Sequence, residues 1–548
     1  MSQQPTKWSQ FGVLITVFFF WGFVAASNSI FIPFCKEYFH LDQIQSQLIG
    51  SAFYGAYFYG SLLLFLFSTL SGTDLLNKIG YKKGIIYGLL ISVVGALALA
   101  FISGSGGATF GLVLVSFFII ALGFSLQQTA AQPFAIALGS EETGAHRLNM
   151  AGSVNSFGTL LGPLVVSWLL FGTVKEGKAA PASIANIQTL YFFLSGLFIL
   201  AALIFAASKL PKTTSDEKLE KSPKALVALV IIGILFLPVL FADGIKEQLH
   251  ISKSTIIYTS LILILLVLFI SMFAAKSNKN GWGAMAYPQL VLGMIAIFVY
   301  VGVEVTIDNN FGALLKLQEF GGYDEAHISH LVSLYWGSLM IGRWTGAVSV
   351  FNIKKSLKKI LGIVVPFLAF GIILLVNIIK GNEVKDFMLY PICIAIAVGA
   401  FLFAGEKPVK LLLTVSVLAA VAMVIALTTT GMVANFAIIS CGLCNSVMWP
   451  CIFALAVNGL GKYTSQGSAF LIMMILGGAI IPPAQGAIID IDKTAVAAGQ
   501  TIMGTNFTHF SYIVPLLCFA YLAWHTLKTK AVLKKQGLDV DAQVAAGH

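Results

Sequence analysis

Two acidic residues, Glu304 and Asp308, lie inside an apolar stretch of the chain, VYVGVEVTIDNNFG. Their spacing of four residues places both carboxyl groups on one face of a helix. Two carboxylates this close in an apolar setting resist ionising together unless a cation joins them. The pair therefore predicts a site for a coupling cation, H⁺ or Na⁺. In the alternative interpretation, Asp308 reaches external water and Glu304 makes a structural hydrogen bond.

A second set of polar side chains in the apolar stretches carries amides and indoles instead of charges. An amide offers hydrogen-bond donors and acceptors, which match the dual character of a sugar hydroxyl, and aromatic rings can cover the apolar face of a pyranose. Gln128 and Gln132 are one helical turn apart and share a face. Each amide could instead join two helices by a hydrogen bond. The candidates for substrate contacts are Asn28, Gln128, Gln132, Asn155, Asn309, Trp336, Asn445 and Trp449.

Basic residues are almost absent from the apolar stretches. The chain has two arginines, Arg147 and Arg343, and both are predicted near the cytoplasmic face. A cavity for phosphate or a dicarboxylate would favour a guanidinium group, so we expect an uncharged substrate. The sequence contains no P-loop, no Gly-x-Ser-x-Gly and no His cluster with metal-ligand spacing. We therefore expect neither an enzyme nor a metal or organic cofactor.

The composition of the chain is that of a membrane protein. Of the 548 residues, 58% are apolar and only 10% are charged, and the mean hydropathy is +0.89. A soluble globular protein carries about 25% charged residues, so lipid must cover most of this surface. The composition excludes a secreted, cytosolic or nucleic-acid-binding globular protein. The net charge of +10 is explained by basic loops, and no nucleic-acid partner is expected.

The apolar stretches predict an all-α polytopic membrane protein. A spanning helix needs about 20 apolar residues, and the alternating pattern of a membrane β-barrel is absent. Placing both termini in the cytoplasm puts 24 of the 33 Lys and Arg on the cytoplasmic side, as the positive-inside rule expects. The sixteen predicted spans are 10–34, 46–70, 84–103, 109–138, 148–172, 188–208, 225–242, 255–275, 286–315, 328–351, 360–379, 387–405, 411–430, 433–458, 466–489 and 507–527.

A weak internal repeat relates the two halves of the chain. When Pro133 is aligned with Pro450, Gln128 matches Asn445 and Gln132 matches Trp449. A charged linker, SKLPKTTSDEKLEKSPK, joins the halves. Two parallel repeats of this kind are typical of transporters whose site lies between the halves at mid-membrane. Chance similarity among apolar helices that contain Gly and Pro is the alternative.

Several motifs in both halves resemble the L-fucose/proton symporter family of the major facilitator superfamily, including its bacterial glucose/galactose transporters. The resemblance implies two pseudo-symmetric six-helix bundles that carry a monosaccharide by alternating access. It also implies a monomer in the bacterial cytoplasmic (inner) membrane, with membrane lipid around it. The motifs are FFFWGFVAASNSIFIPF (18–34), IGSAFYGAYFYG (49–60), QQTAAQPF (127–134), HRLNMAGSVNSFGTLLGP (146–163), YVGVEV (300–305), GSLMIGRWTG (337–346) and GSAFLIMMILGGAIIPPAQG (467–486).

The chain departs from the family pattern at two positions that matter for coupling. Coupled members carry an acid where this chain has Ser29 after Asn28, and another where it has Gln128. The acid in the seventh family helix is kept as Glu304, and Asp308 is additional. The coupling site has therefore either moved into the second half or been lost.

The chain also has four spans more than the twelve of the family. The surplus falls at 225–275 and 360–405, which we predict to be peripheral two-helix hairpins without a direct role in transport. The predicted domains are an N-terminal bundle (1–208), a linker with a hairpin (209–285), the first part of the C-terminal bundle (286–352), a second hairpin (353–409), the rest of that bundle (410–530) and a cytoplasmic tail (531–548).

These observations lead to one hypothesis, an importer of a neutral monosaccharide coupled to H⁺ or Na⁺. A facilitative sugar uniporter is the main alternative. A multidrug exporter of the same fold would show a wide apolar cavity with little amide chemistry. A membrane sugar sensor would carry a long signalling tail, whereas about twenty residues follow Leu527.

Overall fold

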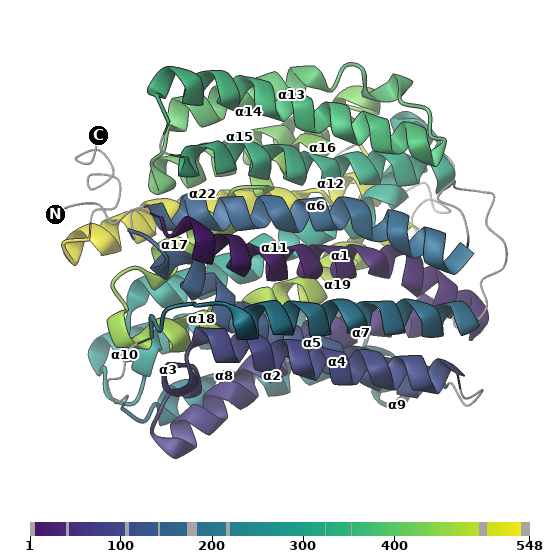
Figure 1. The fold of residues 1–548 in the computed structure, drawn as a ribbon. Coiled ribbons are helices and arrows are strands. Elements are labelled where there is room, and N and C mark those ends of the chain that lie inside the picture. The colour runs from purple at the N-terminus through teal and green to yellow at the C-terminus, as the bar shows by residue number, and fades with distance from the viewer. Residues whose placement is uncertain are drawn as a thin grey trace.

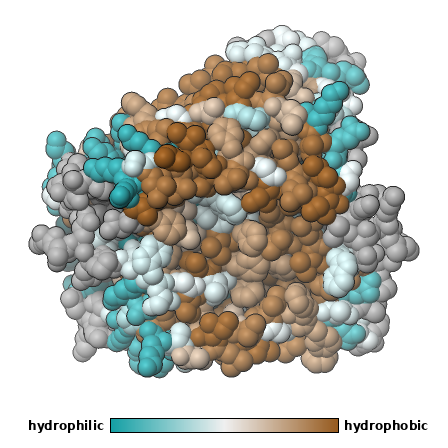
Figure 2. Space-filling view, turned by 45° about the horizontal axis from the view of Figure 1, so that its top comes forward, coloured by the Kyte–Doolittle hydropathy of each residue, from teal (hydrophilic) through white to brown (hydrophobic). Residues whose placement is uncertain are grey.

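The computed structural model describes residues 6–39, 43–104, 109–140, 143–171, 184–214, 220–323, 325–351, 353–492, 501–502 and 504–538. Long helices run side by side, and both termini lie at the same end of the molecule (Figure 1). We call this end the terminus end and the opposite one the far end. Figure 2 shows a broad apolar area across the visible face, with hydrophilic residues concentrated toward the two ends.

The helices of the first half are α1 (Trp8–Tyr38), α2 (Gln43–Ser71), α3 (Leu75–Ile79), α4 (Tyr81–Gly104), α5 (Phe110–Ala137), α6 (Gly144–Phe171) and α7 (Ile184–Ala207). Those of the second half are α11 (Pro288–Leu315), α12 (Glu325–Ala347), α15 (Pro408–Thr428), α16 (Gly431–Asn445), α17 (Met448–Val457), α18 (Thr464–Met473), α19 (Gly477–Ile489), α21 (Phe507–Phe510) and α22 (Ile513–Lys535). The inserted helices are α8 (Pro223–Leu240), α9 (Ala242–Leu249), α10 (Lys253–Ser277), α13 (Lys355–Lys380) and α14 (Pro391–Ala404).

The two halves repeat the same packing. In the first half α1 packs on α6, α4 on α5 and α7, and α2 on α5. In the second half α11 packs on α19, α15 on α16 and α22, and α12 on α16. Each contact of the first half thus has a counterpart in the second, which makes the two bundles of six spans pseudo-symmetric.

The predicted spans correspond to helices, with one qualification. In the part of the chain that the structure describes, fifteen helical segments are long and apolar enough to cross a membrane. The sixteenth predicted span, 328–351, is the 23-residue helix α12, which is more polar because it carries two histidines and Arg343. Its packing on α6 and α16 places it inside the bundle, where protein instead of lipid covers its polar side chains.

Two predicted spans are interrupted in the structure. The span predicted at 433–458 breaks after Asn445, where α16 ends, and resumes as α17 at Met448. The span predicted at 466–489 tightens into a 3₁₀ turn, η7 (Met474–Leu476), between α18 and α19. A 3₁₀ segment inside a helix often marks a functional hinge. Both breaks belong to the second half, whereas α5 and α6 of the first half are continuous.

The hairpin of α8 and α10 lies outside the bundles, as predicted, with 33% of each span buried, but it contacts both halves, which was not predicted. Helix α8 packs on α2 of the first half, where the Tyr59 hydroxyl donates to the Gly233 carbonyl at 3.2 Å. Helix α10 packs on α11 and α19 of the second half, where the Tyr258 hydroxyl donates to the Ala484 carbonyl at 2.7 Å. The hairpin therefore contacts both bundles, a position that its plain apolar sequence does not encode.

The second inserted hairpin, α13 and α14, packs on α12, α15 and α16 of the second half. It lies at the top of Figure 1, where α13 covers α12 and α14 covers α15 and α16. Only 28% of the α13 span is buried, compared with 94% for α11. This hairpin is peripheral as expected, and α11 forms the centre of the second half.

Helices α1 and α6 approach closely because glycines remove the side chains between them. A Cβ atom on Gly22 would collide with the backbone carbonyl of Asn155. Gly12, on the same helix, has no atom near the corresponding position. Close backbone approach through small residues is the usual way in which membrane helices pack.

We expect Gly22→Ala to destabilise the protein, by about 1–3 kcal/mol if the backbones must move apart. Gly12→Ala serves as the matched control, because the same methyl group meets open space there. The measurement is the apparent melting temperature of each purified variant in one detergent. Equal melting temperatures for the two variants would contradict the close packing of α1 on α6.

Candidate functional site

The carboxylate of Glu304 lies near the middle of α11, in contact with two polar side chains. The Tyr300 hydroxyl donates to Glu304 Oε1 at 3.0 Å, and Arg343 Nη2 of α12 lies 3.5 Å from the same oxygen. The side chains of Glu304 and Arg343 are only 12% and 15% exposed. A carboxylate in such a setting is stable only when it is paired and hydrogen-bonded, and here both conditions are met from within the second half.

Arg343 also reaches into the first half. Its Nη1 donates to the Ser156 hydroxyl at 3.0 Å and to Asn155 Oδ1 at 3.4 Å, both on α6. The sequence placed Arg343 near the cytoplasmic face, away from any pocket, and this prediction is wrong. The last turn of α12 lies beside the middle of α11, so the guanidinium reaches the level of Glu304. The signal that could have revealed it is a lone arginine in the span that follows the acidic one.

The other arginine, Arg147, has a structural role. Its Nε donates to the Ala135 carbonyl at 2.8 Å, and Nη2 donates to the Ser140 carbonyl at 2.6 Å, at the C-terminal end of α5. These carbonyls lack partners within the helix, and a cation beside them is favoured by the helix dipole. Arg147 therefore caps α5 and is not part of the central site.

Asp308 does not share a partner with Glu304. Its Oδ1 accepts a hydrogen bond from Trp336 Nε1 at 2.8 Å, and Trp336 is 36% exposed. The two carboxylates lie on the same face of α11, as their spacing predicts, but Asp308 has an indole partner and Glu304 has a guanidinium. Arg343 thus supplies the positive charge that the sequence analysis assigned to a bound cation.

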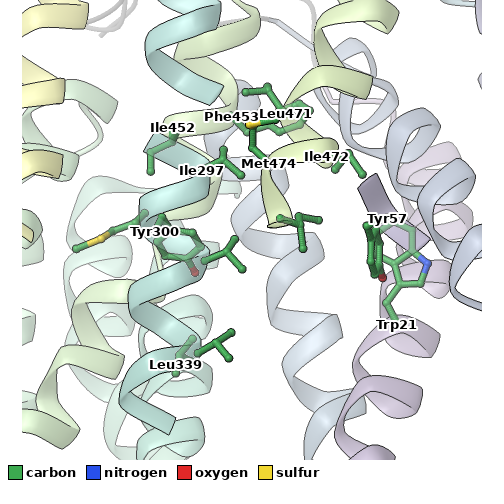
Figure 3. Close-up of a cluster of buried hydrophobic side chains, with 14 of the residues drawn as sticks. Trp21, Tyr57, Ile297, Tyr300, Leu339, Ile452, Phe453, Leu471, Ile472 and Met474 are labelled. Carbon is green, nitrogen blue, oxygen red and sulfur yellow. The ribbon is translucent and has the colours of Figure 1, made fainter. Parts of the chain in front are cut away.

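The amides and aromatic residues of the first half form hydrogen bonds with one another. Gln128 Nε2 donates to the Tyr57 hydroxyl at 2.9 Å, and Trp21 Nε1 donates to Gln127 Oε1 at 2.9 Å. In Figure 3, Trp21 and Tyr57 lie on one side of the region between the halves and Tyr300 lies on the other. Asn155 Nδ2 donates to the Phe18 carbonyl at 3.0 Å, which orients its Oδ1.

Two of the predicted substrate residues flank the break between α16 and α17. Asn445 is the last residue of α16, and its Nδ2 donates to the Tyr335 hydroxyl at 3.1 Å. That hydroxyl donates to the Glu304 carbonyl at 3.0 Å. Trp449 lies in the first turn of α17, with its ring centroid 6.2 Å from that of Tyr300. Interrupted helices commonly form the binding sites of transporters near mid-membrane.

Three of the predicted substrate residues have buried polar atoms without a hydrogen-bond partner in the described part of the chain. These atoms are Gln132 Oε1, Asn445 Oδ1 and Trp449 Nε1. Two are acceptors and one is a donor. A buried polar atom of this kind is costly and calls for an explanation such as a ligand or water. We define the central site as Glu304, Arg343, Tyr300, Tyr335, Asn155, Ser156, Gln128, Gln132, Tyr57, Asn445 and Trp449.

Of the predicted substrate residues whose side chains are described, Asn309 and Trp336 do not join the central site, and Trp336 bonds to Asp308 instead. Asn309 is exposed, and it makes no hydrogen bond with the other described residues. Asn28 lies in α1, but its side chain is outside the described residues. Within the ranges that the structure covers, no group of three His, Cys, Asp or Glu side chains could hold a metal ion.

The halves are joined from the level of the central site, at Thr129 between Gln128 and Gln132, to the terminus end. Asn77 Nδ2 donates to the Lys462 carbonyl at 3.2 Å, and Asn77 Oδ1 accepts from the Ser465 hydroxyl at 2.7 Å. The Ser468 hydroxyl of α18 donates to the Thr129 carbonyl of α5 at 2.8 Å. These contacts close the terminus end between the bundles.

The sequence model of the Major Facilitator Superfamily matches residues 13–405, which is well over half of the chain. The chain belongs to this superfamily. Its fold is similar to that of a superfamily transporter, FucP, in the outward conformation, with a TM-score of 0.62 at 22% identity over 95% of this chain and 98% of that one. The prediction of a major facilitator fold with two inserted hairpins is confirmed.

Curated relatives cover nearly the whole chain. A glucose/galactose transporter of Brucella abortus is 29% identical over 94% of this chain and 92% of its own length. An L-fucose-proton symporter of Escherichia coli is 26% identical over 93% of this chain and 91% of its own length. The resemblance to this group of transporters, inferred from motifs, is thus confirmed.

The pairing of Glu304 with Arg343 can be tested by a double-mutant cycle. Arg343→Met leaves a buried carboxylate without its positive partner. We expect this single variant to be less stable than the double variant, in which both charges are removed. Glu304→Gln combined with Arg343→Met should recover part of that loss, with a coupling of about 0.5–3 kcal/mol. Thermal unfolding in detergent measures all four proteins, and strictly additive effects would show that the two side chains do not interact.

Proposed function

We propose that this protein is a secondary active transporter that imports a neutral monosaccharide, a hexose or deoxyhexose, by alternating access. The observation that carries the proposal is the set of unpartnered polar atoms at Gln132, Asn445 and Trp449, which lie in both halves. Two acceptors and one donor suit the hydroxyl groups of a sugar. The names of the relatives, which concern glucose, galactose and fucose, support the same substrate class.

The substrate is proposed to be uncharged although an arginine lies in the central site. The positive charge of Arg343 is matched by Glu304 at 3.5 Å, and its remaining hydrogen bonds go to α6. An anionic substrate would have to compete with Glu304 for the guanidinium. A polyol can bind to the amides without disturbing this pair.

Coupling is proposed to act through Glu304. A proton or other cation that neutralises this carboxylate would weaken its hold on Arg343, whose other nitrogen already bonds to the opposite half. The cation would thereby change the relative stability of the two facing states, which is the only way in which a ligand can drive the switch. Asp308, one turn away on the more exposed side, is the proposed point of entry for the cation.

The finer features of the protein follow from the same proposal. We place both termini in the cytoplasm of a bacterium, with the protein a monomer in the inner membrane, because the basic residues gather at the terminus end. In this orientation the closed terminus end is the cytoplasmic end. The domain boundaries at 208, 285, 352, 409 and 530 and the absence of enzymatic activity remain predictions.

Trp449→Phe should weaken sugar binding. The substitution keeps the aromatic ring beside Tyr300 and Phe453 but removes the indole N–H, a loss worth about 1–1.5 kcal/mol, or roughly tenfold in affinity. Counterflow in proteoliposomes with radiolabelled glucose, galactose, fucose and N-acetylglucosamine identifies the sugar and then compares the variants. Trp524→Phe, at an exposed position on α22, is the control, and equal affinities in both variants would remove Trp449 from the site.

Glu304→Gln should abolish uphill accumulation driven by a pH or Na⁺ gradient, while sugar exchange in counterflow continues. The substitution keeps the shape of the side chain but removes the charge that the cation must neutralise. Glu319→Gln, at an exposed position near the end of α11, is the matched control. Unchanged uphill uptake in Glu304→Gln contradicts this coupling site, and a wild-type protein that exchanges sugar without accumulating it is a uniporter.

A further inference from the structure

The hairpin of α8 and α10 encloses a groove that the proposed transport function does not use. The groove has a volume of about 530 Å³ and lies between the two helices. Its walls are apolar, formed by Val227, Ala228 and Ile231 of α8 and by Val267 and Ile270 of α10. Val227 is 58% exposed and Ile270 is 63% exposed, so the groove opens toward the surrounding lipid.

One end of the groove is basic. Lys224, in the first turn of α8, lines it together with Pro223 and Trp282. The Lys224 backbone N–H donates to the Gly281 carbonyl at 3.0 Å, and the lysine stem packs against Gly281. Lys224 is exposed, so these contacts hold its stem while its ammonium group remains at the mouth of the groove.

Further lysines surround this mouth. Lys221 precedes α8, and Lys276 and Lys279 follow the groove-lining residues of α10; all three are exposed. Within 220–224 and 276–282 the one acid is Glu220. The apolar groove therefore ends at a local excess of positive charge. The indole of Trp282 lies beside this end, and tryptophans of membrane proteins are enriched at the membrane–water interface.

We propose that this groove binds an anionic phospholipid. One acyl chain lies along Val227, Ile231 and Ile270, and the phosphate contacts the Lys224 ammonium. Apolar walls alone would accept any lipid chain, so the headgroup preference must come from the lysines. Basic pockets between membrane helices at the side that carries the positive charge are suited to anionic headgroups.

The bound lipid would touch the element that bridges the two bundles. Helix α8 packs on α2, and α10 packs on α11 and α19. Any motion of one bundle against the other must therefore shift these contacts. The proposed lipid site is inferred from the groove and its lysines and does not depend on the proposed function. An effect of the lipid on the transport rate would depend on that function.

Tryptophan quenching by brominated phospholipids tests the site, because Trp282 lines the groove. The full-length protein is reconstituted into phosphatidylcholine that contains increasing fractions of brominated phosphatidylglycerol or brominated phosphatidylcholine. The difference between wild type and Trp282→Phe isolates the signal of this residue. We expect the anionic lipid to quench it at an about fivefold lower mole fraction, the factor that corresponds to about 1 kcal/mol for one lysine near an anionic lipid.

Two further variants make the test specific. Lys224→Gln should remove most of the preference, whereas Lys355→Gln, an exposed lysine at the start of α13 in the other hairpin, should leave it intact. Val227→Phe, which fills the groove, should reduce quenching by both lipids. Equal quenching of Trp282 by the two lipids in the wild type, or equal effects of the two lysine variants, would overturn the proposal. Both results are independent of whether the protein transports a sugar.

Discussion

A carboxylate in the middle of an apolar body imposes the strongest constraint on this structure. Glu304 lies on the most buried helix of the second half, and the protein must satisfy it without help from bulk water. Tyr300 and Arg343 do so from within the same half, and Arg343 then contacts Asn155 and Ser156 of the other half. The charge that stabilises Glu304 is therefore also a direct link between the two bundles.

The polar residues of the central site divide into two groups with different tasks. Gln128, Tyr57 and Tyr335 have hydrogen-bond partners within the protein and fix the positions of their neighbours. Gln132, Asn445 and Trp449 retain buried atoms that the described residues do not satisfy. The first group holds side chains of the site in place, and the second group has unsatisfied hydrogen-bonding atoms to which a hydroxylated substrate can bond.

The sequence was sufficient for features that depend on composition along one helix. The length of each apolar stretch predicted the spans, and the rarity of acids inside them singled out Glu304. The sequence did not predict features that depend on the relative positions of two neighbouring helices along their axes. Arg343 is near the end of its own helix but beside the middle of α11, and no local pattern encodes that offset. The contacts of the α8–α10 hairpin with both bundles and the break after Asn445 were not predicted for the same reason, since both are set by tertiary packing.

The two interruptions in the second half isolate one continuous piece of chain. Helices α17 and α18 follow one another between the break after Asn445 and the η7 turn, and they pack on α6, α2 and α5 of the first half. The piece that seals the terminus end is thus bounded on both sides by interruptions of the helix, the break after Asn445 and the η7 turn. A movement confined to this piece would have to loosen its packing on α11 and α15 of its own half. An asymmetric opening of this kind would release cargo through a local movement of one bundle, before the two bundles rock as rigid bodies.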